Sequence, residues 1–220
     1  MITSIQKIID KVNTTHGTSF TLDSSLACNC SVRFHQTTQE DWQAVISKIC
    51  EYTGHVWYID GTTVKVINKL GGITPTLTVN DFQILEDGLS TQSDDAIVNT
   101  FKADWNTEVF DNTARTLVSN NKTSSVSTKL SAGTETTIQP LDYVRSDISS
   151  VLERKKQIHL LDSVTIRLGT PQNIPIGQRI ALDSEYAAGE FVVLSKRFTT
   201  RSDEELSGLG SITYKEFTRT

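Results

Sequence analysis

Residues 37–67 read TTQEDWQAVISKICEYTGHVWYIDGTTVKVI, and this stretch decides the fold of the first part of the chain. Thr37 and Glu40 form the T-x-x-E pattern of a capping box, which marks the beginning of a helix. Hydrophobic residues then recur at a spacing of three or four until Gly54, a residue type that commonly ends helices. The apolar face of this predicted helix consists of Trp42, Val45, Ile46, Ile49 and Tyr52.

The same stretch continues into a predicted β-hairpin. Two runs rich in β-branched and aromatic residues, 56–59 and 63–67, flank Asp60-Gly61. Asp-Gly favours two-residue hairpin turns, because glycine readily adopts the positive φ that such turns require. We therefore expect two antiparallel strands joined at Asp60-Gly61.

The residues before this stretch predict another helix and a strand. An apolar stripe at helical spacing begins near the N-terminus, and its helix is expected to end before Gly17. Residues 31–35 alternate between polar and apolar, so Val32 and Phe34 are predicted to face a core. The stripe consists of Ile2, Ile5, Ile8, Ile9 and Val12.

A change in amino-acid composition after residue 70 predicts a domain boundary. Residues 70–75 contain the glycine and proline of a linker, which separates an α/β module at 1–70 from a β domain at 71–220. Residues 95–105 predict a strand with Val98 and Phe101 as core candidates.

Two further segments interrupt this β domain. Residues 106–137 are dominated by Asn, Ser and Thr, which predicts a long polar hairpin or loop. Residues 140–161 predict one helix across a sheet, with Pro140 in its first turn. Its apolar positions are Leu141, Val144, Ile148, Val151, Leu152 and Ile158, and its later turns carry Arg154, Lys155 and Lys156.

The remaining C-terminal segments predict short strands at close spacing, as in a small barrel or sandwich. The predicted fold class is therefore α+β: a helix–strand–helix–hairpin module followed by a tube-like β-barrel or sandwich with one packed helix. The predicted C-terminal strands are 163–168, 174–177, 179–182, 189–194 and 210–217.

Composition limits the classes of partner. The chain has 220 residues, is 37% hydrophobic and carries a net charge of −5, with Lys and Arg scattered rather than clustered. Sequence-specific nucleic-acid binding is not expected, because it requires a basic stripe. The sequence has no run long enough for a membrane span and no signal-peptide pattern at its start, so we expect production in a cytoplasm.

The sequence does not contain the common catalytic motifs. G-x-x-x-x-G-K-[ST], G-x-S-x-G and H-E-x-x-H are all missing, so no catalytic or cofactor-binding residue is predicted. Structural roles are expected for the four histidines, His16, His35, His55 and His159. The paired acids Asp94-Asp95 and Asp203-Glu204-Glu205 are interpreted as solvated loop residues, because a glycosidase would need one desolvated carboxyl.

Cysteines and aromatic residues offer two other candidate sites. Cys28, Cys30 and His35, with Cys50 or His55, supply ligand types for zinc or an iron–sulfur centre, but C-x-C is tighter than the usual C-x2-C. The prediction is therefore three thiols and no metal. Trp42, Trp57 and Tyr58 could stack on sugars, but the helical position of Trp42 favours core packing, and either Trp57 or Tyr58 must face inward.

The order of these elements resembles the middle α/β module of bacteriophage tail hub proteins, which join the tail tube to the spike or fibre. The resemblance rests on residues 5–17, 32–34, 38–54 and 57–67. Residues 168–194, with Pro-x-Gly before a strand and then Ala-Gly-Glu-Phe-Val-Val, also resemble the last barrel of hubs and tail-tube proteins. The first module is similar as well to small domains of secretins and of TonB-dependent receptor N-termini, which carry an export signal and a membrane barrel.

The hub resemblance implies a non-enzymatic virion component of the tail tip or baseplate, assembled in the host cytoplasm and forming part of the DNA conduit. Complete hubs of the contractile-tail type have a barrel before the module, so we expect either a partner that supplies one or six copies in a ring. Implied partners are further copies of the chain in a trimer or hexamer, a tail tube or distal tail protein, a spike or fibre protein, and a tape-measure protein. Residues 106–130 or their flanking strands are expected to make subunit contacts. The alternatives are a ring protein of a secretion system or other injection device, and a carbohydrate-binding tail accessory protein.

Overall fold

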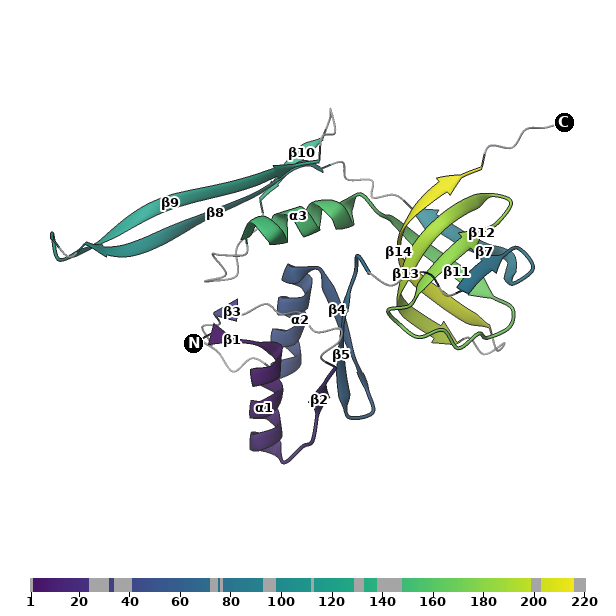
Figure 1. The fold of residues 1–220 in the computed structure, drawn as a ribbon, viewed down its shortest axis with the longest axis horizontal. Helices are drawn as coiled ribbons and strands as arrows, with labels where there is room; N and C mark the ends of the chain where they lie inside the picture. The colour runs from purple at the N-terminus through teal and green to yellow at the C-terminus, as the bar shows by residue number, and fades with distance from the viewer. Residues whose placement is uncertain are drawn as a thin grey trace.

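The computed structural model describes residues 2–23, 32–33, 41–71, 75, 77–92, 98–111, 113–128, 133–137, 148–198 and 203–215. In these residues three helices and four β-sheets form a mixed α+β fold, as predicted (Figure 1). A curled sheet lies at one end, a long two-stranded ribbon extends from the other, and a small α/β module lies between and below them (Figure 1).

The α/β module packs two helices against a three-stranded sheet of order β2-β5-β4. Helix α1 (Ile5–His16) ends at Gly17 with φ 64°, as the sequence predicts. Buried residues from both helices and β5 form one hydrophobic core. The other elements are α2 (Trp42–Thr53), β2 (Thr21–Leu22), β4 (His55–Asp60) and β5 (Thr63–Asn68).

Two local predictions in this module are wrong. The N-cap of α2 is Asp41, whose carboxylate accepts from the backbone N–H of Gln43, so the helix begins after the predicted capping box. Thr37, Glu40 and Phe34 lie outside the described residues. In the hairpin, Asp60 pairs with Thr63, and the two-residue loop is therefore Gly61-Thr62 rather than Asp60-Gly61.

The predicted strand at 31–35 is described only in part. Strand β3 (Val32–Arg33) pairs antiparallel with β1 (Ile2–Thr3), a two-residue strand that precedes α1.

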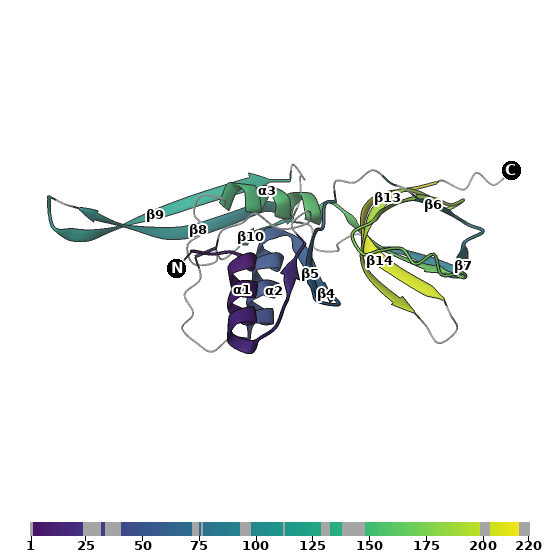
Figure 2. The ribbon, with the colours of Figure 1, turned by 60° about the horizontal axis from the view of Figure 1, so that its bottom comes forward.

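The curled sheet has six strands in the order β6-β12-β13-β14-β11-β7 and forms a half-barrel, which we call the barrel (Figures 1 and 2). Its two edge strands, β6 and β7, are consecutive in sequence and joined by residues 81–83 alone, so the sheet must curl to bring its edges near each other. Its strands are β6 (Leu77–Asn80), β7 (Ile84–Gln92), β11 (Asp162–Leu168), β12 (Arg179–Asp183), β13 (Ala187–Phe198) and β14 (Glu204–Tyr214).

The barrel confirms most of the predicted C-terminal strands. Alternate residues of its strands point into a shared core that includes Ile166, Phe191 and Leu206. Residues 174–177, predicted as a strand, instead form part of the connection between β11 and β12. Strands β6 and β7 were not predicted from the sequence.

Residues 106–137 were predicted to form either a long polar hairpin or a loop, and the described part of this segment forms a hairpin. Strands β8 (Val98–Asp111) and β9 (Thr116–Ser127) pair from Thr100↔Ser127 to Asp111↔Thr116, and we call this ribbon the arm. Strand β10 (Thr134–Thr137) adds in parallel to the base of β8. Helix α3 (Ile148–His159) crosses the base, and Val98 and Phe101 are buried against it, as predicted.

Candidate functional site

The linker between the α/β module and the barrel is held by Arg179 of β12. One guanidinium nitrogen, Nη2, donates to the carbonyls of Leu70 at 2.9 Å and Gly71 at 2.8 Å. The other, Nη1, lies 3.3 Å from a carboxylate oxygen of Glu190 on β13. Nη2 thus binds two successive backbone carbonyls at once while Nη1 faces Glu190, which fixes the direction in which the linker leaves the module.

Close packing at Gly71 adds to this contact. Gly71 has φ 47°, and a Cβ at this position would lie 2.4 Å from Cγ2 of Val192 on the barrel. The linker backbone thus approaches the barrel more closely than a residue with a side chain would allow.

A second junction joins the module to α3. Arg154 of α3 donates from Nη1 to the carbonyl of Thr53 at 2.6 Å, so a cation lies at the C-terminal end of α2. Gly54, which ends α2 with φ 73°, packs against Ile158 and Arg154. Val151 of α3 belongs to the core of the module.

His55 lies beside this junction, at the start of β4. It is buried, and burial together with the nearby Arg154 lowers its pKa to about 4. Thr53 Oγ1 donates to the carbonyl of Ile49, and it therefore accepts from His55 Nδ1 at 3.0 Å. The ring of His55 is thus neutral, hydrogen-bonded and buried, which is consistent with the structural role predicted for this histidine.

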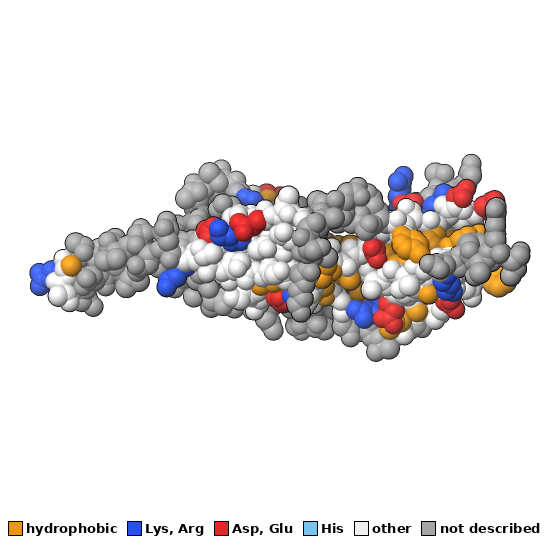
Figure 3. Space-filling view, turned by 90° about the horizontal axis from the view of Figure 1, so that it is seen from above, with side chains coloured by type: hydrophobic (Ala, Val, Ile, Leu, Met, Phe, Trp, Pro, Cys, Tyr) orange, Lys and Arg blue, Asp and Glu red, His pale blue; other side chains and the backbone are white. Residues whose placement is uncertain are grey.

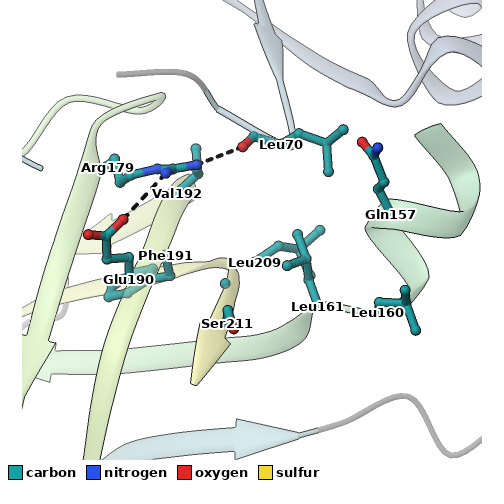
Figure 4. A pocket seen from close by; sticks show the side chains of 11 residues that line it. Leu70, Gln157, Leu160, Leu161, Arg179, Glu190, Phe191, Val192, Leu209 and Ser211 are labelled. Carbon is teal, nitrogen blue, oxygen red and sulfur yellow. Dashed lines mark hydrogen bonds and ion pairs between the residues drawn. The ribbon is translucent and has the colours of Figure 1, made fainter. Parts of the chain in front are cut away.

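A cavity of about 330 Å³ opens where the linker, the end of α3 and the barrel meet; we call it the junction cavity (Figure 4). Leucine side chains from the linker and from the α3–β11 connection converge on it, with the Arg179–Glu190 pair along one side (Figure 4). Leu160 is half exposed. The apolar lining includes Leu70, Leu160, Leu161, Val192 and Leu209.

The base of the arm is anchored to α3 by several contacts. The backbone N–H of Val98 donates to Nε2 of His159 at 3.1 Å, and the His159 ring packs edge-on against Phe101. Thr128 Oγ1 donates to the carbonyl of Val98 at 2.9 Å. Beyond this base the arm extends past α3 and the module in both ribbon views (Figures 1 and 2).

The acidic triplet 203–205 corrects the sequence interpretation. Asp203 and Glu204 are buried at the start of β14, and are not solvated loop residues. Glu204 accepts three backbone N–H bonds, from Gln172 at 2.7 Å, Asn173 at 3.0 Å and Ile174 at 3.2 Å. Its carboxylate holds the β11–β12 connection in place.

Two neighbours complete this anchor. Asp203 lies 3.5 Å from the guanidinium of Arg167 on β11. Lys196 of β13 donates from Nζ to Asn173 Oδ1 at 3.3 Å and to the carbonyl of Ile174 at 3.2 Å. The connection is thus held from both its N–H and its carbonyl side. These contacts give the acids a structural use.

The aromatic residues of the module pack as predicted. Trp42 lies between Phe20 and Trp57, with ring centroids 5.8 and 6.0 Å away. Trp57 packs against the module core and donates from Nε1 to Ser47 Oγ at 2.9 Å. Trp57 is therefore the inward-facing member of the Trp57-Tyr58 pair.

The cysteines and histidines considered as candidate ligands do not form a cluster in the described part of the chain. Cys50 is buried in the module core, and burial raises the pKa of its thiol to about 12. No group of three or more metal-ligating side chains occurs among the described residues. The other candidates, Cys28, Cys30, His35, Asp94 and Asp95, lie outside them.

Exposed aromatic residues on the barrel were not predicted. Phe82 in the β6–β7 connection is 100% exposed, and Tyr186 and Tyr214 are more than half exposed. Figure 3 shows hydrophobic side chains gathered over the barrel end of the molecule. Helices in the described residues are all too short or too polar to cross a membrane.

No protein-family model matches the chain, and no curated protein sequence is measurably similar to it. Solved structures are similar. The 43 kDa tail protein of prophage MuSo2 from Shewanella oneidensis matches 94% of the chain with a TM-score of 0.60 and 9% sequence identity. The prophage tail protein gp18 from Listeria monocytogenes EGD-e matches 94% with a TM-score of 0.58 and 12% identity.

The chain spans 65% of the length of each of these two structures. At such low identity the similarity concerns the arrangement of the backbone. It extends over the module, the arm and the barrel together, since 94% of the chain is covered. The chain therefore has a fold that is also found in two prophage tail proteins.

Proposed function

We propose that this chain is a non-enzymatic structural subunit of a phage tail tip or baseplate hub, which joins the tail tube to a spike or fibre. The observation that carries this proposal is the match of nearly the whole chain to two prophage tail proteins. A chance match to a single common barrel would cover the barrel alone. The hub resemblance of the sequence is independent support.

The internal contacts agree with a structural role. The buried carboxylate of Glu204 accepts three backbone N–H bonds that hold a loop, and both of its oxygens are hydrogen-bonded. Arg179 and Arg154 bind backbone carbonyls at the two junctions. In each case a charged side chain fixes the position of backbone groups within the fold.

We extend the proposal to a ring of identical subunits around the DNA conduit. Partners of the ring are a tail tube or distal tail protein on one side and a spike or fibre protein on the other, with a tape-measure protein in the lumen. A net charge of −5 is compatible with a conduit that does not retain phosphates. Among the described strands, β9, β6 and β7 lie at the edges of their sheets, and edge strands can pair with a neighbouring chain.

The proposal is tested by deleting the gene from the phage genome that encodes it and imaging the particles by electron microscopy. We expect heads without complete tails, and full recovery when the intact chain is supplied from a plasmid. Supplying the chain with Lys11→Gln, a change at an exposed position of α1, should also restore tails and controls for expression. Normal infectious particles from the deletion strain would contradict the proposal.

A further inference from the structure

The connection between β6 and β7 presents a phenylalanine on a hydrogen-bonded turn. Phe82 lies in this connection and is 100% exposed. Its backbone N–H donates to Oδ1 of Asn80 at 3.2 Å. Gln83 closes the turn, because its N–H donates to the Asn80 carbonyl at 3.0 Å and its Oε1 accepts from the Asn80 N–H at 3.1 Å. The backbone on both sides of Phe82 is therefore fixed, although its side chain is entirely exposed to water.

A second turn is bonded to the first. The N–H of Glu185, in the β12–β13 connection, donates to a carboxylate oxygen of Asp81 at 2.7 Å. Ser184 holds this second turn, since its Oγ accepts from the N–H of Tyr186 at 3.2 Å. Tyr186 is 52% exposed, so two exposed aromatic side chains lie on neighbouring turns. We call residues 80–83 and 184–186 the turn pair.

The turn pair differs from the single apolar residues that are scattered over most protein surfaces and need no explanation. It carries two aromatic side chains on turns that are bonded to each other, and hydrogen bonds fix the backbone that presents them. Aromatic anchors of this kind dominate the binding energy of many interfaces. A fixed backbone also lowers the entropy that is lost on binding. The turn pair therefore has the features of a docking surface.

Acidic groups lie beside the aromatic side chains of the turn pair. Asp81 and Glu185 are both exposed. A hydrogen bond to Glu185, together with the negative charges of Glu185 and Asp81, raises the pKa of the Tyr186 hydroxyl, so both carboxylates act on this side chain. Asp183, next to the second turn, pairs with Lys215 at 2.7 Å, which leaves the other two acids to set the charge. The turn pair is thus both aromatic and acidic.

A surface that fits the turn pair has an apolar centre and a positive charge. An apolar pocket would receive the Phe82 ring and remove it from water. Lys or Arg on the rim of that pocket would face Asp81 and Glu185, and an arginine can also stack on an aromatic ring. Nucleic acids and anionic lipids do not fit, because their phosphates would face the same carboxylates. The chemistry therefore favours a protein that has an apolar pocket with a basic rim.

The junction cavity of another copy does not supply this complement. Its lining is apolar, but the arginine on it, Arg179, is already bonded to the carbonyls of Leu70 and Gly71. The same lining carries Glu190, a carboxylate that would repel the acids of the turn pair. A different protein is therefore the better fit.

We propose that the turn pair docks a different protein, with Phe82 inserted into an apolar pocket and Lys or Arg of the pocket rim facing Asp81 and Glu185. The inference deepens the proposed function and rests on it for the identity of the partner: a tail tube, distal tail, spike or fibre protein would supply the pocket. The docking itself is argued from the turn pair alone.

A photo-crosslinker within the turn pair identifies the partner. In the full-length chain, Tyr186 is replaced by p-benzoylphenylalanine, which leaves Phe82 in place and on irradiation bonds to C–H groups that it touches. The chain is supplied from a plasmid to the deletion phage, infected cells are irradiated, and mass spectrometry maps the crosslinked peptides. The same crosslinker at Ile59, an exposed apolar residue of β4 in the α/β module, is the matched control.

We expect position 186 to crosslink a protein other than this chain, at a site with apolar residues and Lys or Arg, and position 59 not to crosslink that site. Phe82→Asp should lower the crosslink yield by at least about tenfold, because a carboxylate would enter an apolar pocket, and Phe82→Leu should lower it less. Glu185→Lys should lower it about tenfold through repulsion from the basic rim. Asp10→Lys, the same charge change at an exposed position of α1, should leave the yield unchanged. Thermal unfolding establishes that each variant is folded.

Three results would overturn the inference. The first is a crosslink from position 186 to other copies of this chain alone. The second is the absence of any protein crosslink from position 186 in infected cells. The third is a yield that neither Phe82→Asp nor Glu185→Lys changes. Failure of the proposed function is a separate result: normal tails from the deletion strain would refute the tail role, whereas a mapped crosslink to a basic-rimmed apolar pocket of a protein outside the tail would still support the docking surface.

Discussion

At the scale of single residues, Glu204 shows how one carboxylate can organise a connection of the barrel. It is completely buried and accepts three backbone N–H bonds from residues 172–174. The burial of Glu204 could have been predicted from the sequence, although residues 203–205 were interpreted as a solvated loop. Glu204 and the apolar Leu206 are two residues apart, and on a strand such residues share a face.

Replacing Glu204 should be costly. Glu204→Ala leaves three buried or half-buried N–H groups without an acceptor, and we expect the free energy of unfolding to fall by about 3 kcal/mol. Glu204→Gln should cost less, because its amide oxygen still accepts. Urea unfolding followed by fluorescence measures both. Glu205→Gln, the neighbouring acid that makes none of these three bonds, should change stability little; an equal loss there would contradict the assignment.

His55 predicts a dependence of stability on pH. Its pKa is about 4 in the folded chain and near 6.5 when unfolded, so the unfolded state binds more protons between these values. The free energy of unfolding should therefore fall as pH drops from about 6.5 to 4, by roughly 3 kcal/mol from this residue. His55→Asn should remove that component of the pH dependence. Parallel slopes for wild type and variant would show that another group is responsible.

At the scale of secondary-structure elements, the sequence predicted the elements that have internal periodicity and clear ends. The helices ending at Gly17 and Gly54, the β4–β5 hairpin and four of the five C-terminal strands are present. Strand β6 was missed because four residues at a sheet edge give too short a pattern. The strand predicted at 174–177 fails for two physical reasons: Pro175 has no N–H, and the N–H of Ile174 is bound by Glu204.

Two helix-ending glycines form a matched pair for a test of packing. Gly17 and Gly54 both have positive φ, 64° and 73°, so alanine strains both to a similar extent. A Cβ on Gly17 meets nothing within 4 Å, whereas on Gly54 it would lie 2.7 Å from Ile158 and 2.8 Å from Arg154. Gly17→Ala should cost about 1 kcal/mol. Gly54→Ala should cost about 1–3 kcal/mol more, because the side chains of Ile158 and Arg154 must move away from the new Cβ.

Thermal or urea unfolding of the two variants measures the difference directly. Equal losses of stability would mean that α3 does not pack on the end of α2 in solution. A larger loss of stability for Gly54→Ala would support the packing of α3 on the end of α2.

At the scale of the whole molecule, the arrangement of the parts was not predictable from the sequence. The helix at 140–161 was predicted as part of the β domain, but the packing of α3 on α2 and of the arm on α3 could not be predicted. These contacts join residues about a hundred positions apart, such as Arg154 with Thr53 and Arg179 with Leu70. Periodicity carries no information about such pairs, because it describes each element separately.

Arg179 should determine how firmly the barrel is held to the module. Arg179→Gln loses the charge-assisted bonds to two linker carbonyls, so we expect a wider range of orientations and a larger radius of gyration by small-angle X-ray scattering. Arg179→Lys should be intermediate, since an ammonium lacks the planar fork. Arg167→Gln, on β11 and away from the linker, is the control. Identical scattering from all four proteins would show that Gly71 packing alone fixes the orientation.

The central claim is that this chain is a subunit of a ring at the tip of a phage tail. The most direct measurement is a cryo-electron microscopy map of the tail tip of the phage that encodes it. We predict density for this fold in a closed ring around the tail axis, next to the tube, with the arm of each subunit reaching its neighbour. A complete and infectious tail whose map holds no density for this fold would contradict the claim.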